Sequence, residues 1–210
     1  MTATRLDGDE ALGSFAELVA AGTPTPGGGS VAAHCGMMAA ALGRMVCNLT
    51  IGKPKFADRE PRLKEIRHEL EGLGHRLREL IAEDAASFEA VLSAYRLPKE
   101  TDEQKAVRTE SIQAGILVAV SVPLETAERT LEVLKLLREL ADSGNPSAIS
   151  DVAVGSQLAQ AAIKGASYNV AANLGTMTDR DKASEADRGV KAFIEDAAVL
   201  AAEVEAKTTQ

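Results

Sequence analysis

The middle of the chain carries a long series of apolar residues spaced three and four apart, and this pattern restricts the possible folds more than any other feature. The series contains Leu63, Ile66, Leu70, Leu73, Leu77 and Leu80, and it resumes at Phe88, Val91 and Tyr95. Such spacings place side chains on one face of an α-helix. We therefore expect a long helix that buries this face.

Asp84 occupies the position where the next apolar residue of this series would fall. A buried carboxylate loses hydration, and its pKa rises unless it is paired or hydrogen-bonded, which prepares it for proton transfer. The alternative is a residue that fixes helix register or pairs with a buried Arg or Lys. Asp84 is thus the first catalytic candidate, although the apolar series alone does not separate the two interpretations.

The other segments also carry helical signals, and none shows the sustained alternation, flanked by hairpin turns, that is typical of strands. The expected helices cover residues 11–21, 29–49, 58–97, 101–122, 124–140, 147–174 and 181–207. Pro123 is expected to break or kink the chain between two of them. We predict one all-α domain over residues 1–210, an up-and-down antiparallel bundle of about seven helices with long central helices.

Composition argues against nucleic-acid and membrane partners. The 210 residues carry a net charge of −8 and no tryptophan, which disfavours binding to nucleic acid. Residues 1–10 lack the apolar core of a signal peptide, so we expect a cytoplasmic protein. Residues 27–43 are uncharged but rich in Ala and Gly. They are too weakly hydrophobic for membrane insertion and predict a core helix packed on all sides.

The segment Gly27-Gly28-Gly29-Ser30 follows two prolines and opens onto the start of a helix. Exposed N–H groups at such a terminus can hold a carboxylate or a phosphate. The segment matches neither common nucleotide-binding glycine motif. It is therefore a candidate anion-binding turn, with a purely structural turn as the alternative.

Glycines recur every seven residues along the same predicted helix, at Gly29, Gly36 and Gly43. This repeat leaves a groove in which another backbone can approach closely. It predicts a tight antiparallel bundle or a dimer seam, and an ordinary Ala-rich core is the alternative.

Other polar residues form weaker candidate sites. Near the end of the second predicted helix lie Asn48, Lys53 and Lys55, and at the start of the sixth lie Asn145, Ser150 and Asp151. The lysines are suited to an anionic substrate tail, or they are simply solvated. N-capping explains much of the second group. Asn169 and Asn173 share a helix face and are either buried hydrogen-bonding residues or ligand contacts.

Metal-ligand and nucleophile patterns are weak in this sequence. His34 stands alone on an apolar helix, where a core histidine is the simpler interpretation. Cys35 and Cys47 lie about 18 Å apart along one helix and are expected to be reduced thiols. We therefore predict no metal site.

Several segments, taken in order, resemble the cyclodeaminase/cyclohydrolase family, which includes the C-terminal half of formiminotransferase-cyclodeaminase. The matching segments are residues 25–33, 48–53, 84–88, 97–99, 122–125, 144–145, 148–151 and 169–170. The resemblance implies an all-α bundle that forms a homodimer and binds tetrahydrofolate derivatives without a metal or nucleotide cofactor. His34 and Cys35 depart from the small residues that are typical at these positions.

The resemblance also implies roles for individual residues. Asp84 belongs to a D-A-x-x-F motif whose aspartate is regarded as catalytic. Gly27–Ser30 and Asn48 would shape the pterin or one-carbon pocket. Lys53 and Lys55 would hold glutamate carboxylates. Asp151 would contact pterin nitrogens.

Without a formiminotransferase domain, the chain is most similar to stand-alone methenyltetrahydrofolate cyclohydrolases. We therefore expect hydrolysis of 5,10-methenyltetrahydrofolate to 10-formyltetrahydrofolate, with Asp84 as general acid and base. One alternative is a formiminotetrahydrofolate cyclodeaminase that releases ammonia. A second is a helical subunit that binds folate without catalysis.

Overall fold

The structure, a computed structural model, describes residues 12–208, and all regular structure in this range is helical. The α-helices are α1 (Leu12–Ala20), α2 (Gly28–Thr50), α3 (Glu60–Tyr95), α4 (Asp102–Ser143), α5 (Ile149–Leu174) and α6 (Arg180–Thr208). Two short 3-10 helices, η1 (Pro54–Phe56) and η2 (Pro146–Ala148), precede α3 and α5. The all-α prediction is confirmed; the predicted helix start at Ala11 lies outside the described residues.

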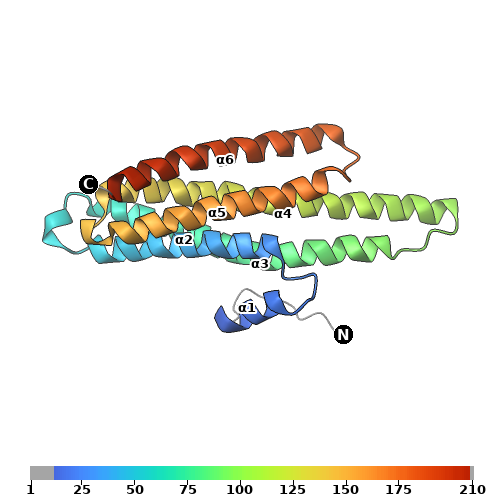
Figure 1. Cartoon of the computed structure of the whole chain (residues 1–210), viewed down its shortest axis with the longest axis horizontal. Coiled ribbons are helices and arrows are strands. Elements are labelled where there is room, and N and C mark those ends of the chain that lie inside the picture. Colours follow the sequence, from blue (N-terminus) through green and yellow to red (C-terminus); the bar gives the residue numbers. More distant parts are fainter. Residues whose placement is uncertain (1–11, 209–210) are drawn as a thin grey trace.

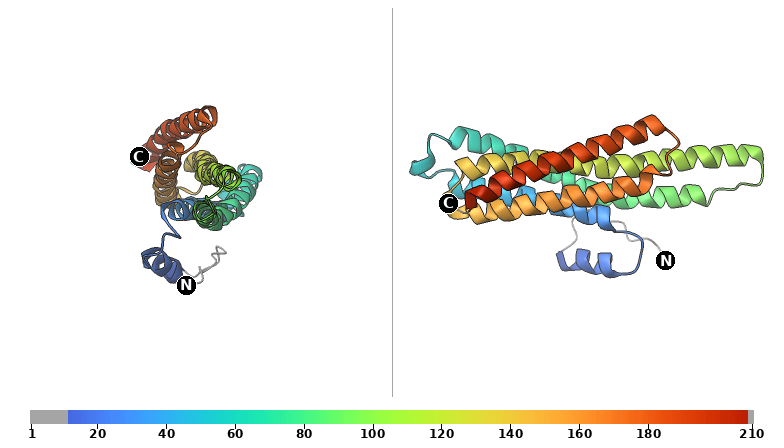
Figure 2. Two further views of the ribbon diagram at one scale, coloured as in Figure 1. Left: turned by 90° about the vertical axis from the view of Figure 1, so that its right-hand side faces the viewer. Right: turned by 45° about the horizontal axis from the view of Figure 1, so that its top comes forward.

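Helices α2 to α6 form an elongated up-and-down bundle in which each helix runs antiparallel to the one before it (Figure 1). Helix α2 packs against α3, α4 and α5, while α6 covers α4 and α5. Helix α1 lies apart from the bundle, below α2 (Figure 2). The predicted antiparallel bundle with long central helices is therefore correct.

The glycine repeat of α2 fixes its register against α3. A Cβ atom added to Gly36 would lie 2.5 Å from Thr130 Oγ1 and 3.2 Å from Leu77 Cδ2, and one added to Gly43 would lie 2.7 Å from Leu70 Cδ1. The third glycine, Gly29, meets Asp84 in the same way. Three residues of α3 at seven-residue spacing thus lie against three glycines of α2, as expected for the tight antiparallel bundle that the repeat predicted.

The apolar series of α3 is buried only where α2 covers it. Its members from Leu63 to Leu80 are buried, except for the partly buried Leu73, whereas Phe88 and Tyr95 are 40% and 46% exposed. Burial of these two residues, expected from the spacing, is wrong. Since α2 begins at the level of Asp84, α3 extends beyond it with α4 alongside (Figure 1).

Pro123 lies within one continuous helix of 42 residues, α4, so a break at Pro123, one of the two expected outcomes, is wrong. Residues 12–208 therefore form six α-helices instead of about seven. Proline has no N–H, which leaves the carbonyl of Ala119 without its usual helical donor. The side-chain amide of Asn173 on α5 donates to that oxygen at 3.2 Å. Of the two roles considered for Asn173, the structure shows the hydrogen-bonding one.

The Asn173→Ala variant is expected to lose about 1–3 kcal/mol of stability, because the Ala119 carbonyl then lacks a partner. In a Pro123→Ala background the restored amide supplies that donor, so the same change should cost less. Chemical denaturation of the four variants of this double-mutant cycle measures the difference. Strict additivity would contradict the account.

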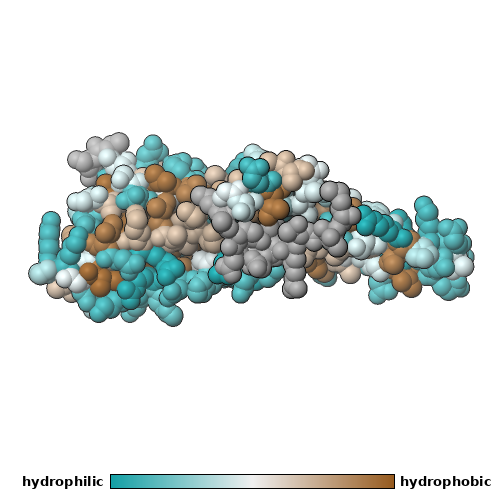
Figure 3. All heavy atoms as spheres, turned by 90° about the horizontal axis from the view of Figure 1, so that it is seen from below, coloured by the Kyte–Doolittle hydropathy of each residue, from teal (hydrophilic) through white to brown (hydrophobic). Residues whose placement is uncertain are grey.

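We expected helix α2 to be packed on all sides, but one of its sides is uncovered. Among the described helices, α2 alone is long and apolar enough to cross a membrane by length and composition. Half of the 18-residue stretch that meets this criterion is buried. Its uncovered side contributes to a hydrophobic area beside α1, seen from below in Figure 3. This side carries Met38, Ala41, Met45 and Leu49, all exposed, and we call it the outer face of α2.

Candidate active site

Asp84 reaches from α3 to the first turn of α2. The Ser30 hydroxyl lies 2.9 Å from Asp84 Oδ2 and 3.0 Å from the Ile81 carbonyl, and it can donate to either oxygen. The Ser30 backbone N–H also interacts with the carboxylate. The N-cap residue of α2, Gly27, has no side chain to cap the helix. Asp84 therefore supplies, from another helix, the acceptor that a capping side chain normally provides.

Gly29 allows the Asp84 carboxylate to approach the α2 backbone. A Cβ atom at Gly29 would lie 2.1 Å from Asp84 Oδ1 and 2.6 Å from its carboxyl carbon. Any side chain at this position would therefore have to displace the carboxylate. Gly29 and Ser30 thus form one local arrangement with Asp84.

Burial raises the pKa of Asp84 above its ordinary value of 3.8, and the hydrogen bonds from the Ser30 side chain and backbone oppose the shift. No Arg or Lys contributes to this shift. The alternative of a carboxylate neutralised by a buried cation is therefore not supported. What remains is a partly desolvated carboxylate held by two donors at a helix N-terminus, an arrangement suited to proton transfer.

Asn169 on α5 lies on the other side of the α2 N-terminus. A Cβ atom on Gly28 would lie 3.7 Å from Asn169 Nδ2. That amide nitrogen donates to the Gly165 carbonyl at 3.0 Å. The contact places Asn169 beside the glycine turn. In the sequence, Asn169 was marked by its shared helix face with Asn173 and by the family resemblance of residues 169–170, but neither signal placed it at this turn.

The remaining predicted site residues lie at the opposite end of the bundle. They are Asn48, Lys53, Lys55, Asn145, Ser150 and Asp151. Asn48 follows Ser30 by 18 residues of one helix, which corresponds to about 27 Å along its axis. Within one chain, the structure therefore does not bring these residues to Asp84.

Several of these residues have structural contacts at that end. The Asn48 Oδ1 atom accepts from Arg67 at 3.3 Å. Asn145 caps η2 by accepting from the Ser147 N–H at 3.2 Å. Its own N–H donates to the Thr50 hydroxyl at 2.9 Å. The N-capping interpretation of this group is therefore confirmed for Asn145.

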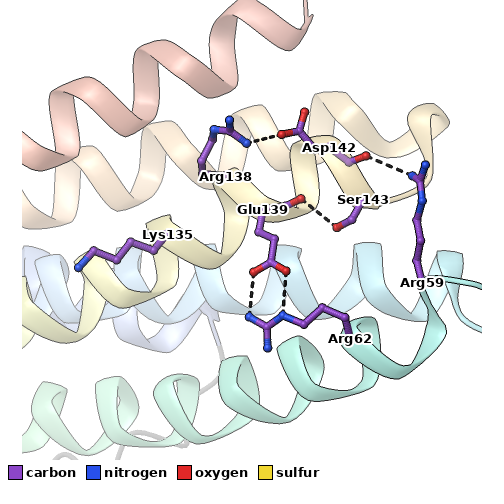
Figure 4. Close-up of a pocket in the computed structure, with 7 residues that line it drawn as sticks. All are labelled: Arg59, Arg62, Lys135, Arg138, Glu139, Asp142 and Ser143. Atoms are coloured by element: carbon purple, nitrogen blue, oxygen red, sulfur yellow. Dashed lines mark hydrogen bonds and ion pairs between the residues drawn. The ribbon is translucent and has the colours of Figure 1, made fainter.

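A charged cleft of about 420 Å³ lies near the same end, between the start of α3 and the end of α4 (Figure 4). Arg62 makes a two-pronged ion pair with Glu139, with both bonds at 2.8 Å. Arg59 donates to the Asp142 carbonyl at 3.2 Å, and Arg138 pairs with the Asp142 carboxylate. These arginines are already bound to acceptors, so the cleft is a charge network between helices.

His34 is not a core histidine. It is partly buried and stacks on Phe15 of α1, with ring centroids 5.1 Å apart. Burial lowers the pKa of His34, which favours the neutral ring. Cys35 is also partly buried. Cys47 is buried, which raises the pKa of its thiol to about 11 and keeps it protonated. His34 therefore joins α1 to the outer side of α2.

The raised pKa of Asp84 predicts how the free energy of unfolding depends on pH. Above the ordinary value of 3.8 the unfolded chain releases the proton, whereas the folded protein retains it until its higher pKa is reached. The folded state binds more protons in this window, so Asp84 destabilises it as pH rises. Relative to Asp84→Asn, the parent should lose unfolding free energy from below pH 3.8 towards neutrality. Parallel denaturation curves measure this difference, and a gain would contradict the shift.

The fold and this site together define a class of protein: an all-helical bundle that holds a partly buried carboxylate against the glycine-rich start of a neighbouring helix. Residues 11–192 match the family model described as formiminotransferase-cyclodeaminase. The chain belongs to this family, as the ordered motifs indicated.

Individual relatives agree with this assignment. A methenyltetrahydrofolate cyclohydrolase from Methylorubrum extorquens is 41% identical, over 92% of this chain and 93% of the relative. The formimidoyltransferase-cyclodeaminase of Rattus norvegicus is 37% identical over 81% of this chain, which spans about a third of that protein. The crystal structure of formiminotetrahydrofolate cyclodeaminase from Thermotoga maritima is 29% identical, with a TM-score of 0.83 and 96% coverage of both chains.

Proposed function

We propose that the protein is a methenyltetrahydrofolate cyclohydrolase that converts 5,10-methenyltetrahydrofolate and water to 10-formyltetrahydrofolate. The observation that carries this proposal is the Asp84 carboxylate, held at the α2 N-terminus by Ser30 and approached closely by Gly29. The similarity to the Methylorubrum cyclohydrolase along nearly the whole of both chains supports the choice of reaction.

The proposed reaction uses one carboxylate twice. Asp84 accepts a proton from the water that attacks the carbon between N5 and N10, and a hydroxyl adduct forms. Protonated Asp84 then donates to N5 as the carbon–N5 bond breaks, and the hydroxyl proton leaves to solvent as the formyl C=O forms. The ionised carboxylate also favours the cationic ring before attack. Atoms and charge balance, with one proton released per turnover.

The raised pKa of Asp84 assists the first step, because a carboxylate with a higher pKa is a stronger base. The same shift makes the protonated form a reachable intermediate for the second step. Ser30 limits the shift by donating to the carboxylate, so that the ionised form remains available. Burial and hydrogen bonding therefore have opposing effects on one group, and their balance sets its reactivity.

The wider proposal is a cytoplasmic homodimer whose chemistry needs no metal or nucleotide cofactor. The exposed outer face of α2 supports self-association, since an apolar area of this kind is typical of an interface. The carboxylate supports acid–base chemistry that requires no bound ion.

A chelator is expected to leave turnover unchanged. Purified protein dialysed against EDTA should hydrolyse methenyltetrahydrofolate at the rate of untreated protein. A loss of activity that zinc or magnesium restores would contradict the proposed absence of a metal. Separate measurement of substrate binding would show whether the metal acts on catalysis or on affinity.

The test of the function is the loss of methenyl-folate absorbance on addition of purified protein. The Thermotoga structure and the bifunctional relatives favour cyclodeaminase activity as the second candidate. Ammonia release from formiminotetrahydrofolate should therefore be measured on the same sample. Hydrolysis without ammonia release supports the proposal, whereas ammonia release without hydrolysis replaces it. Folate binding with neither activity would identify a binding subunit.

A further inference from the structure

The side of α3 that faces α2 continues beyond the start of α2. Leu70, Leu77 and Asp84 lie against the three glycines of the α2 repeat. Phe88 follows Asp84 by one helical turn and therefore lies on the same side of α3. Helix α2 begins at Gly28, one residue before the glycine that meets Asp84, so it does not extend over Phe88 (Figure 1). The Phe88 side chain is consequently 40% exposed.

Phe88 differs in its surroundings from the other aromatic residues of the described chain. Each of the others is stacked on a histidine, covered by a cation or packed against the core. They are Phe15, Phe56, Tyr95, Tyr168 and Phe193. Within residues 12–208, Phe88 alone combines an exposed ring with no ring or cation partner. An unpartnered aromatic ring one turn from the candidate catalytic carboxylate is suited to contact a ligand.

A polar side chain lies beside the same end of α2, on another helix. Asn169 of α5 approaches Gly28, which is itself exposed. The start of α2 is therefore flanked by Asp84 and Phe88 from α3 and by an amide from α5. An amide can exchange hydrogen bonds with the N–H and C=O groups of a ligand, whereas a phenyl ring offers only an apolar face. The two sides of the site thus favour different parts of one molecule.

The proposed substrate has two ring systems, one on each side of the reacting carbon. The pterin adjoins N5 and is rich in N–H and C=O groups, whereas the p-aminobenzoyl ring is bonded to N10 and has apolar faces. Side chains four residues apart on a helix have Cβ atoms about 5–6 Å apart. When the reacting carbon lies at Asp84, the ring on N10 is therefore within reach of Phe88. Aromatic pairs favour offset stacking with centroids about 4.5–7 Å apart.

We propose that Phe88 stacks on the p-aminobenzoyl ring of the substrate while Asp84 acts on the carbon between N5 and N10, and that the pterin extends from Asp84 toward Asn169. This inference rests on the proposed function for its ligand and on the exposed ring for its position. Phe88 contacts the substrate away from the atoms that react. It is therefore a specificity-determining residue, which sets the affinity for the substrate and takes no part in proton transfer.

The first test is the kinetics of Phe88→Leu, which keeps an apolar side chain but removes the flat ring. Because the stack is present in both the substrate complex and the transition state, KM should rise about three- to tenfold while kcat changes less than about twofold. An unchanged KM would overturn the stacking.

Tyr95→Leu is the matched control for this variant. Tyr95 lies further along the same side of α3 and is 46% exposed, but the Arg108 guanidinium already lies over its ring, 5.5 Å from the centroid. Its KM should stay within about twofold of the parent value. An equal rise of KM in both variants would show a general effect on this part of α3, and the specific role of Phe88 would be wrong.

The second test changes the substrate. A methenyl analogue with a methyl group on N10, in place of p-aminobenzoylglutamate, has no ring for Phe88 to contact, so parent and Phe88→Leu should have the same KM for it. Methenyltetrahydropteroate lacks only the glutamate and should show the full difference in KM. An equal difference for both analogues would mean that Phe88 contacts another part of the substrate, which would overturn the proposal.

The third test does not depend on catalysis. Titration calorimetry measures the Kd of 5-formyltetrahydrofolate, which keeps both ring systems but has no bridging bond to hydrolyse. The Kd should rise about three- to tenfold in Phe88→Leu and stay unchanged in Tyr95→Leu. Weaker binding by Phe88→Leu, when the parent binds folate but hydrolyses no methenyl substrate, would refute the proposed function and support the stacking.

Two other results would overturn the stacking. One is an unchanged Kd in Phe88→Leu when the parent hydrolyses the methenyl substrate, which leaves the proposed function intact. The other is a change in molecular mass, measured by light scattering of Phe88→Leu, without a change in Kd. That result would show that the Phe88 ring packs against another copy of the chain and not against the substrate.

Discussion

The Asp84→Asn variant is expected to hydrolyse 5,10-methenyltetrahydrofolate with kcat lowered about 10²–10⁴-fold, the range typical for loss of a general acid–base group. The amide is nearly the same size and can still accept from Ser30, but it cannot take a proton from water or return one to N5. Steady-state rates from the loss of methenyl absorbance measure the effect. Because the fold retains its contacts, substrate affinity should change much less than kcat.

The neighbouring carboxylate provides a matched control. Glu83 lies on the same helix and pairs with Arg76 at 2.6 Å, on a part-exposed network with Glu125. Glu83→Gln removes the same charge one residue away and should leave kcat within about twofold, because the exposed pair adds little to stability. Full turnover by Asp84→Asn, or an equal loss in both variants, would remove Asp84 from its assigned role.

The Gly29→Ala variant is expected to lose most of its activity and to be destabilised by about 1–3 kcal/mol, the typical cost of overpacking. The added Cβ would lie 2.1 Å from Asp84 Oδ1, so the carboxylate must leave its position beside Ser30. Activity should therefore fall further than the loss of stability explains. Turnover measured well below the denaturation midpoint, together with a denaturation curve, separates the two effects.

Gly72→Ala is the control for this substitution. Gly72 lies in the interior of α3, with nothing within 4 Å of an added Cβ. The change should stabilise the helix by about 0.5–1 kcal/mol and leave turnover intact. If Gly29→Ala behaved like Gly72→Ala, the close approach of Asp84 to α2 would be wrong.

Two periodic patterns marked the residues of the local site separately, and only the family resemblance grouped these residues in one site. Asp84 interrupts an apolar series, and Gly29 begins a seven-residue glycine repeat. Both patterns follow from helix geometry, but neither reports which residues of the two helices meet, and the contact of Asp84 with Gly29 is seen only in the structure. The chemical role of Asp84 was less accessible, since the series alone also allowed a buried ion pair.

Contacts between distant segments could not be predicted in this way. Pro123 argued for two helices by local rules, but Asn173 supplies the donor that the proline lacks, and α4 continues. The exposure of Phe88 depended on where α2 begins beside α3. Both outcomes are set by which helices lie side by side, and residue spacing within one segment does not report that.

The family resemblance had a similar limit. It grouped Lys53 and Asp151 with Asp84 as parts of one site, yet in one chain they lie at opposite ends of the bundle. The order of motifs along a sequence does not report how far apart the motifs lie in the folded chain.

The most direct test of the role of Asp84 is the pH dependence of kcat/KM for methenyltetrahydrofolate hydrolysis, in the parent and in Ser30→Ala. The parent should lose activity in acid with an apparent pKa above the ordinary 3.8 of aspartate, since burial raises the pKa of Asp84. The Ser30 hydrogen bond opposes that shift, so the acid limb should move to higher pH in Ser30→Ala. An acid limb that does not move, or that persists in the residual activity of Asp84→Asn, would contradict proton transfer by Asp84.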